Sequence, residues 1–165
     1  IRAVIMNKLE MDVRDTVLLA NAESIAVEAS MVAYEGVVIA AERDAGSLRT
    51  MEENASKFGT HNIEIIPEIT VEALEKLPTP RLAFIVAQKS TIENDIVTLL
   101  KVNPKIKIII YTLELDILAD IKYLMKKHGV DVTEVMQIAV SKVDKNGVFV
   151  AQPAPWMITC EVKEK

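Results

Sequence analysis

The residues best placed to do chemistry in this sequence follow two apolar runs near its start. The first run, Thr16 to Ala20, leads directly into a helical pattern that begins near Glu23. The second run, Val37 to Ala41, is followed at once by Glu42, about 20 residues beyond the first turn. An acid at this spacing is the type of residue that binds ribose hydroxyls in nucleotide-binding α/β folds. Taken alone, Glu42 can equally be an exposed acid at the start of a helix.

The turn after the first run contains no glycine. The stretch from Val17 to Glu28, which leads from this strand pattern into the helix, has none. Nucleotide-type turns use glycine because the backbone has to approach the ligand closely and can need a positive φ. Asn21 is the residue of this stretch that best takes the place of a glycine, because Asn tolerates the left-handed region. The sequence therefore indicates a nucleotide-type scaffold whose ligand pocket has changed.

Other kinds of active site find no support in the residues. His61 and His128 are far apart and are expected at the surface, and with Cys160 they do not make the three or four convergent ligands of a metal site. Cys160 lies in an apolar strand pattern and is interpreted as a buried structural thiol. The sequence has no Gly-Lys-Ser/Thr phosphate loop and no Gly-x-Ser-x-Gly turn, which excludes the common NTPase and hydrolase motifs.

One weak anion-site pattern remains. Lys89 and Ser90 precede a helical pattern that starts near Thr91. Backbone amides at a helix start attract negative charge, so these residues could face an anion. An ordinary Ser/Thr helix cap explains the same pattern and stays open as the alternative.

Composition bounds the class of protein. The 165 residues, of which 50% are hydrophobic, suit one domain spanning 1–165. The net charge of -5, without a Lys/Arg cluster, excludes a protein that reads a nucleic-acid backbone. No apolar run approaches the roughly 20 residues of a membrane span, so we expect no membrane association and a cytoplasmic location. The chain begins with Ile1, which leaves open that it is part of a longer polypeptide.

Alternating strand and helix patterns predict an α/β fold with a mostly parallel sheet and helices on both faces. The helix 46–58 places Leu48, Met51, Ala55 and Phe58 on one face, and Gly59 stands where a left-handed C-cap is expected. The helix 113–128 begins with acids and ends with bases before Gly129, which suits the helix dipole. The predicted strands are 16–20, 37–41, 63–66, 82–86 and 106–111.

The last third of the chain changes pattern. Two strand-like runs, 131–142 and 148–161, are joined by a turn that contains Asn146-Gly147, a strong hairpin signal. Pro153 and Pro155 have to lie at an edge or in a loop, because proline cannot donate to a ladder. We therefore expect an antiparallel hairpin to end the parallel sheet.

Across nearly its full length the chain resembles the decarboxylating precorrin-6Y C5,15-methyltransferase family of cobalamin biosynthesis, in its C-terminal or T-type form. That family methylates a precorrin at two ring positions and removes an acetate carboxyl. No single motif is specific, but the order and spacing of several are. They are Ile1-Arg2-Ala3-Val4, Ser24 to Ala29, Ala41-Glu42-Arg43-Asp44, Glu53-Asn54-Ala55, Phe58-Gly59, Phe84-Ile85, Thr112-Leu113-Glu114 and Pro155-Trp156-Met157-Ile158.

The resemblance implies a Rossmann-like class I methyltransferase fold with S-adenosylmethionine as the methyl donor and no metal. It places the first donor loop of the family, Gly-Ala-Gly-Thr-Gly, at residues 19–23, and so maps donor contacts to Ala20, Asn21 and Glu23, with the bulk of Leu19 and the charge of Glu23 expected to hinder binding. Glu42 matches the acid that holds the donor ribose. If Glu23 points inward it would repel the methionine carboxylate of the donor, and the alternative is that it only decorates the helix start.

Two further loops also depart from the family pattern. After the third strand the family has Gly-Asp-Ala, whose acid accepts from the adenine amino group, where this chain has Glu68-Ile69-Thr70. After the fourth strand the family has a glycine-rich loop that faces the substrate, where this chain has Val86-Ala87-Gln88-Lys89. Ile69 thus marks a lost adenine contact, and Gln88 and Lys89 mark the substrate crevice. Lys89 and Arg81 could still meet a carboxylate of the tetrapyrrole.

Three hypotheses follow. The first is a precorrin methyltransferase-like domain that is impaired in donor binding, catalytically weak or inactive, and paired with an active methyltransferase partner domain. The second is an active methyltransferase and decarboxylase, and the third is a binding module for another ligand. We assign no catalytic residue, and the resemblance implies a tetrapyrrole substrate and a homo-oligomer.

Overall fold

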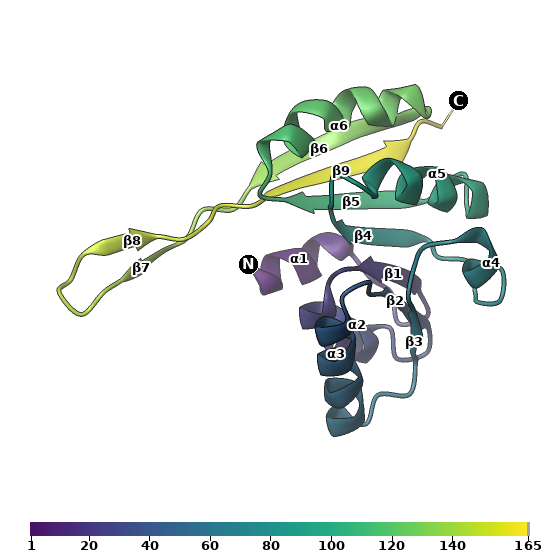
Figure 1. The fold of residues 1–165 in the computed structure, drawn as a ribbon, viewed down its shortest axis with the longest axis horizontal. Helices are drawn as coiled ribbons and strands as arrows, with labels where there is room; N and C mark the ends of the chain where they lie inside the picture. Colours follow the sequence, from purple (N-terminus) through teal and green to yellow (C-terminus); the bar gives the residue numbers. More distant parts are fainter. Residues whose placement is uncertain (165) are drawn as a thin grey trace.

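The computed structural model describes residues 1–164, in which a seven-stranded sheet carries helices on both faces (Figure 1). The strand order is β3-β2-β1-β4-β5-β9-β6, with β1 to β5 parallel and β9 antiparallel to both of its neighbours. This confirms the predicted α/β fold, and the five parallel strands lie within one residue of their predicted bounds. The strands of this sheet are β1 (Thr16–Ala20), β2 (Val37–Ala41), β3 (Ile63–Ile66), β4 (Leu82–Val86), β5 (Lys107–Thr112), β6 (Val130–Gln137) and β9 (Trp156–Val162).

Each face of the sheet has its own layer of helices and its own core. Because side chains alternate along a strand, Leu19 of β1 points toward one layer and Leu18 toward the other. The layer on the side of Leu19 consists of α1 (Arg2–Leu9), α2 (Glu23–Val32) and α3 (Ala45–Phe58). The layer on the side of Leu18 consists of α4 (Val71–Leu74), α5 (Ile92–Val102) and α6 (Leu115–Lys127).

The predicted glycines at the ends of α3 and α6 are confirmed, and α3 also has a side-chain cap at its start. The Asp44 carboxylate accepts a hydrogen bond from the Ser47 amide at 2.7 Å and caps α3, which ends at Gly59 in the left-handed region with φ 67°. The chain after α6 turns at Gly129 with φ 77°. The predicted apolar face of α3 is wrong in one residue, because Phe58 is exposed at the last turn, where α3 has already run past the edge of the core.

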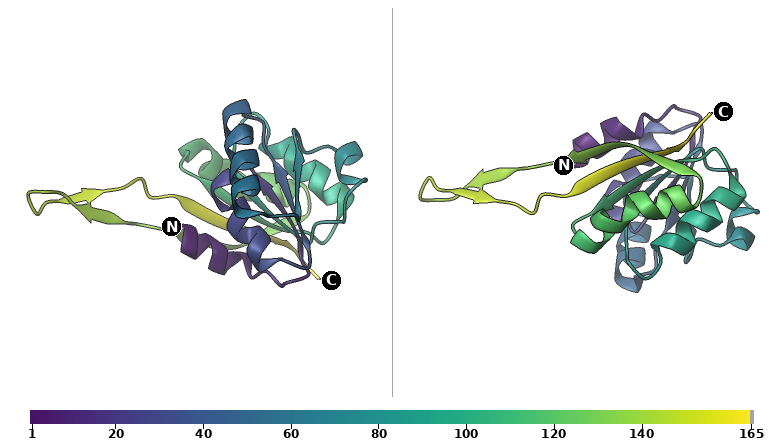
Figure 2. Two further views of the ribbon diagram at one scale, coloured as in Figure 1. Left: turned by 90° about the horizontal axis from the view of Figure 1, so that it is seen from below. Right: turned by 90° about the horizontal axis from the view of Figure 1, so that it is seen from above.

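The C-terminal third forms the predicted hairpin, but each run is interrupted. Beyond β6 the chain forms β7 (Ser141–Val143) and β8 (Phe149–Ala151), a separate two-stranded sheet, before it returns as β9. The turn contains Gly147 with φ 78°, and Pro153 and Pro155 lie between β8 and β9, outside the ladders. Residues 138–155, which we call the arm, extend well away from the sheet (Figures 1 and 2).

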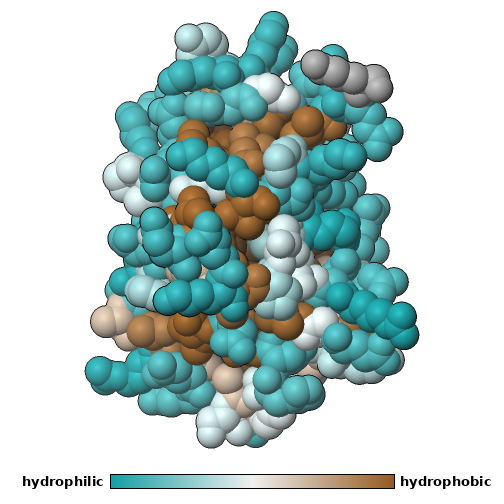
Figure 3. Space-filling view, turned by 90° about the vertical axis from the view of Figure 1, so that its right-hand side faces the viewer, coloured by the Kyte–Doolittle hydropathy of each residue, from teal (hydrophilic) through white to brown (hydrophobic). Residues whose placement is uncertain are grey.

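The opposite side of the molecule has a mixed surface. Seen from the side away from the arm, apolar residues show in a band that is crossed by hydrophilic side chains (Figure 3). Within residues 1–164, none of the helices has the length and apolar character needed to span a membrane.

Candidate functional site

The carboxyl ends of β1, β2, β4 and β5 meet at one edge of the sheet, where open α/β sheets bind their ligands. A cavity of about 240 Å³ lies at this edge, and we call it the crevice. The turn after β1 contributes Asn21 and Glu23, β4 and β5 contribute Phe84 and Tyr111, and α1 borders it with Ile5. The arm leaves the sheet on the same side (Figure 1).

Asn21 makes the turn that glycine makes in nucleotide-type loops. Its φ of 55° lies in the left-handed region. Its amide donates to the Ala41 carbonyl at 2.9 Å, and its side-chain nitrogen donates to the Val86 carbonyl at 3.2 Å. Asn21 therefore ties the ends of β2 and β4 to the end of β1. Its Oδ1 is buried and has no hydrogen-bond partner within residues 1–164.

The residues before Asn21 do not enter the crevice. Leu19 and Ala20 are the last residues of β1, and both are buried in the core with no more than 1% exposed. The interpretation that Leu19 obstructs the loop is therefore wrong, because strand alternation turns its side chain into the core beside α1 and α2. Ala20 faces the opposite core, so this position offers no side chain to a ligand.

Glu23 and Glu42 bring two carboxylates to this edge. Glu23 is the first residue of α2, lines the crevice and is half-buried, while Glu42 directly follows β2 and is 4% exposed. Burial raises the pKa of the Glu42 carboxyl, the Asp44 amide that donates to it at 3.2 Å lowers this pKa, and the charge of Glu23 raises it. Glu23 also sits in the first helical turn, where the helix dipole favours an acid. Its position thus suits both the helix and the crevice.

A buried ion pair closes the neighbouring part of this edge. The Arg43 guanidinium, directly after Glu42, donates to the Asp95 carboxylate of α5 at 2.7 and 3.4 Å. Asp95 is 1% exposed, and burial raises its pKa while the hydrogen bond and charge of Arg43 lower it. The Arg43 Nε is buried without a partner among the described residues. This pair fastens α5 to the end of β2.

After β3 an acid was expected at the position of Ile69, and the chain has its carboxylate one residue earlier, at Glu68. Ile69 is 1% exposed and belongs to the core, so its side chain is not available to a ligand. Glu68 is exposed and lines an open hollow of about 420 Å³ together with Arg43 and Thr70. Sequence reasoning did not single out Glu68 as an acid that lines a hollow, although its place after a strand was a usable signal.

Of the two residues expected at the substrate crevice, Gln88 and Lys89, the second lies at a different groove. Gln88 and Lys89 are both exposed after β4. The Lys89 ammonium pairs with the Asp116 carboxylate of α6 at 2.7 Å, which raises the pKa of Lys89 and lowers that of Asp116. Lys89 therefore borders a groove of about 410 Å³ between α5 and α6 rather than the cavity beside Asn21.

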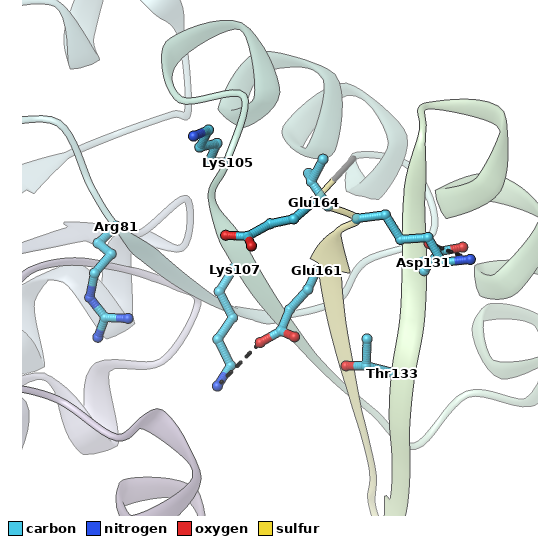
Figure 4. Close-up of a pocket in the computed structure, with 9 residues that line it drawn as sticks. Arg81, Lys105, Lys107, Asp131, Thr133, Glu161 and Glu164 are labelled. Carbon is cyan, nitrogen blue, oxygen red and sulfur yellow. Dashed lines mark ion pairs between the residues drawn. The ribbon is translucent and has the colours of Figure 1, made fainter.

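Arg81 lies at the amino edge of the sheet, at the opposite end of the strands from the crevice. It precedes β4 and donates to both oxygens of Asp15 at 2.7 Å. It borders a hollow of about 770 Å³ that Figure 4 shows, where cations and carboxylates from β5, β6 and β9 lie together. Lys107 pairs there with Glu161 at 3.7 Å. Charges of both signs alternate around this hollow, so no single ligand charge is selected.

Tyr111 is a crevice residue that the sequence reasoning missed. Its ring packs against Phe84 with centroids 6.0 Å apart and planes at 57°. Burial raises the pKa of its hydroxyl, so it stays neutral at physiological pH. The signal was its position at the carboxyl end of β5, the same rule that selected Glu42 after β2.

The comparisons with known proteins agree with this architecture. A profile described as "Precorrin methyltransferase domain" matches residues 1–162. The fold is similar to precorrin-6y C5,15-methyltransferase from Geobacter metallireducens GS-15, with a TM-score of 0.87 and 26% identity over 98% of this chain and 87% of that one. It is also similar to precorrin 8w decarboxylase from Methanobacterium thermoautotrophicum, with a TM-score of 0.78 and 20% identity over 98% and 89%.

A third similar structure is the C-terminal domain of precorrin-6Y C5,15-methyltransferase from Rhodobacter capsulatus, with a TM-score of 0.72 and 16% identity over 97% and 87%. No curated protein matches the sequence. The strand order with its antiparallel β9 and the helices on both faces give the Rossmann-like methyltransferase fold. Because the profile covers nearly all of its residues, the chain belongs to the precorrin methyltransferase domain family.

Proposed function

We propose that this chain is a precorrin-6Y methyltransferase-like domain of cobalamin biosynthesis whose S-adenosylmethionine site is weakened, so that its own catalysis is slow or absent. The observation that carries the proposal is Glu23 in the crevice beside the buried Glu42. Glu23 then faces a ligand whose methionine part carries a carboxylate of its own.

Some residues fit the donor. Glu42 has the position of a ribose-binding acid at the end of β2. The left-handed turn at Asn21 keeps the loop open to a close approach without a glycine. With the donor bound, the sulfonium would supply the methyl group. Glu42 would hold the ribose, and the backbone around Asn21 would face the methionine part.

Glu23 does not fit the methionine carboxylate. Two carboxylates about 4 Å apart repel each other by roughly 4 kcal/mol at an effective dielectric of about 20. That corresponds to nearly a thousandfold in affinity. The donor also carries a sulfonium and an ammonium, which Glu23 attracts. The proposal therefore depends on whether removing the Glu23 charge raises or lowers the affinity for the donor.

The residues at the expected adenine contact also differ from the family pattern. Ile69 is in the core, and the space after β2 holds the Arg43–Asp95 pair. Glu68 offers an acceptor in the same hollow that Arg43 lines. For the acceptor substrate we assign Gln88 and Lys89, which are exposed after β4, to contacts with tetrapyrrole carboxylates outside the cavity beside Asn21. An active methyltransferase domain as partner would supply the chemistry that this crevice lacks.

Calorimetric titration with S-adenosylmethionine tests the proposal. We expect weak or undetectable binding to the wild-type chain and tighter binding by Glu23→Gln, with a gain of up to about a thousandfold. Glu52→Gln, on the exposed part of α3, removes the same charge away from the crevice and should change nothing. Micromolar binding by the wild type that Glu23→Gln weakens would show that Glu23 serves the donor, and the proposal would be wrong.

A second function is favoured by Asn21. Because it keeps the left-handed turn and ties β1, β2 and β4 together, the loop can be preorganised for the donor without glycine. The chain would then be an active precorrin methyltransferase and decarboxylase. Transfer of a labelled methyl group from S-adenosylmethionine to a precorrin, lost in Glu42→Ala, would establish this second function over the first.

A further inference from the structure

The wall of the crevice carries a negative charge that no side chain among residues 1–164 pairs with. Glu23 lines the crevice and is half-buried, and it takes part in none of the ion pairs of the described chain. Arg2 is the cationic side chain of the lining, but its guanidinium pairs with Glu28 at 3.1 Å. A carboxylate without a partner attracts a cation and repels an anion. The crevice therefore favours a cationic ligand.

Glu23 also supplies the negative group that the start of α2 favours. This helix begins at Glu23 after Ala22, which makes no side-chain cap hydrogen bond. The first amides of a helix and its dipole attract an anion, and at an uncapped helix a ligand can supply one. Here a carboxylate of the chain itself stands in the first turn. A ligand in the crevice consequently gains little from a carboxylate of its own.

A hydrogen-bond acceptor without a partner lies beside this charge. Asn21 lines the crevice two residues before Glu23. Its side-chain nitrogen donates to the Val86 carbonyl at 3.2 Å, while its buried Oδ1 accepts no hydrogen bond from the described residues. A buried acceptor without a partner is unfavourable, so a ligand N–H that reaches it is stabilised. Amide and carboxylate oxygens together suit an ammonium, which has three N–H donors and no acceptor.

The size and the walls of the crevice suit a short organic cation. Its volume of about 240 Å³ is below the roughly 300 to 1,000 Å³ of pockets that enclose a whole drug-sized ligand. Phe84 and Tyr111 line it as a packed pair, and aromatic rings attract a cation that lies over their face. The crevice thus has room for a small ligand or for one arm of a larger one.

We propose that the crevice binds an alkylammonium arm that carries no carboxylate, and that Glu23 and Asn21 select it. Decarboxylated S-adenosylmethionine has such an arm on a nucleoside sulfonium, and a free alkylamine has the same ammonium. The selection rests on the proposed function, because there Glu23 repels the carboxylate of the methyl donor. A ligand without that carboxylate escapes the repulsion and keeps the positive charge that Glu23 attracts.

Calorimetric titration of the chain with S-adenosylmethionine and with its decarboxylated form tests this selection. The two probes differ by one carboxylate, and the repulsion at about 4 Å corresponds to as much as about a thousandfold in affinity. We expect the decarboxylated form to bind the wild type at least about tenfold more tightly. In Glu23→Gln, which keeps the size of the side chain, this preference should disappear. Glu52→Gln, on the exposed part of α3, should keep it.

Two smaller probes separate the ammonium from the nucleoside. 5′-Methylthioadenosine has the nucleoside without the ammonium, and it should bind at least about tenfold more weakly than the decarboxylated donor. 3-(Methylthio)propylamine has the ammonium arm without the nucleoside. If it binds as tightly as the decarboxylated donor, the ligand is a free alkylamine, and if it binds much more weakly, the ligand is a nucleoside with this arm. Either result agrees with the proposal.

The proposal is overturned if the decarboxylated donor does not bind, or binds no better than S-adenosylmethionine or 5′-methylthioadenosine. A preference that survives in Glu23→Gln overturns it as well. The proposed function fails by a different result, namely micromolar binding of S-adenosylmethionine that Glu23→Gln weakens. A chain that binds neither form of the donor therefore retains the proposed function and excludes the alkylammonium ligand.

Discussion

Removing Arg43 should destabilise the fold in a manner that depends on pH. Arg43→Met keeps most of the side-chain volume but leaves the Asp95 carboxylate, 1% exposed, without its cation. Losing one partner of a buried pair costs about 3 to 5 kcal/mol. Water reaches the Arg43 side chain, which is 18% exposed, so we expect a loss of about 3 kcal/mol near neutral pH. In a domain of this size that lowers Tm by about 6 to 12 °C.

The pH dependence follows from the pKa of Asp95. Burial already raises this pKa, and Arg43 is the main group that lowers it, so Arg43→Met raises it further. The folded state of the variant then holds the proton more tightly than the unfolded state. Its free energy of unfolding falls as pH rises from the ordinary Asp value of 3.8 through the raised value. The cost of the substitution should therefore be much smaller at about pH 4 than at about pH 7.

Urea unfolding followed by circular dichroism at both pH values measures the effect. Asp95→Asn is the control, because it removes the buried charge and retains the shape of the side chain. The charge that then lacks a partner is that of Arg43, which is 18% exposed rather than 1%. It should cost about 1 to 2 kcal/mol with little change between the two pH values. Equal costs of Arg43→Met at both pH values, or a larger cost for Asp95→Asn, would refute the idea that an uncompensated Asp95 charge is the cause.

Three further substitutions or measurements address the scaffold. Gly36→Ala would push a Cβ against the backbone carbonyl of Asp15, so thermal unfolding should show a loss of about 2 kcal/mol. Asp44→Ala removes the cap of α3 and should lower Tm at neutral pH. Because the Ser47 amide lowers the pKa of Asp44, the difference in Tm from the wild type should vanish as pH falls through that lowered pKa. Burial raises the pKa of Cys160 to about 12, so a thiol reagent should react with the native chain far more slowly than with the urea-unfolded chain. Fast labelling without denaturant would contradict the buried position of this thiol.

Most of the fold could be predicted from local patterns. The parallel strands are continuous apolar runs because both of their faces are buried, and such runs are visible in the sequence. Gly59 and Gly129 could be assigned to helix ends because a residue with positive φ is needed there. Asn21 follows the same logic, since Asn is the side chain that tolerates the left-handed region best after glycine.

The candidate site could be predicted only in part, because its contacts join distant segments. Arg43 and Asp95 are 52 residues apart, and nothing in either neighbourhood marks them as a pair. Leu19 was misassigned because a loop pattern was extended into a strand, where alternation decides the direction of the side chain. Arg81 directly precedes β4, so it lies at the amino end of that strand and away from the crevice.

The single tryptophan stands at the junction between the arm and the sheet. Trp156 opens β9 directly after the prolines, half-buried, and pairs with Thr112 of β5 on one side and Gln137 of β6 on the other. Its indole emission therefore reports on one place only. A displacement of the arm relative to the sheet, or binding of a large ring system beside Thr112, would change the emission wavelength of Trp156 or its accessibility to a quencher. The protein therefore carries an intrinsic fluorescent probe of this junction.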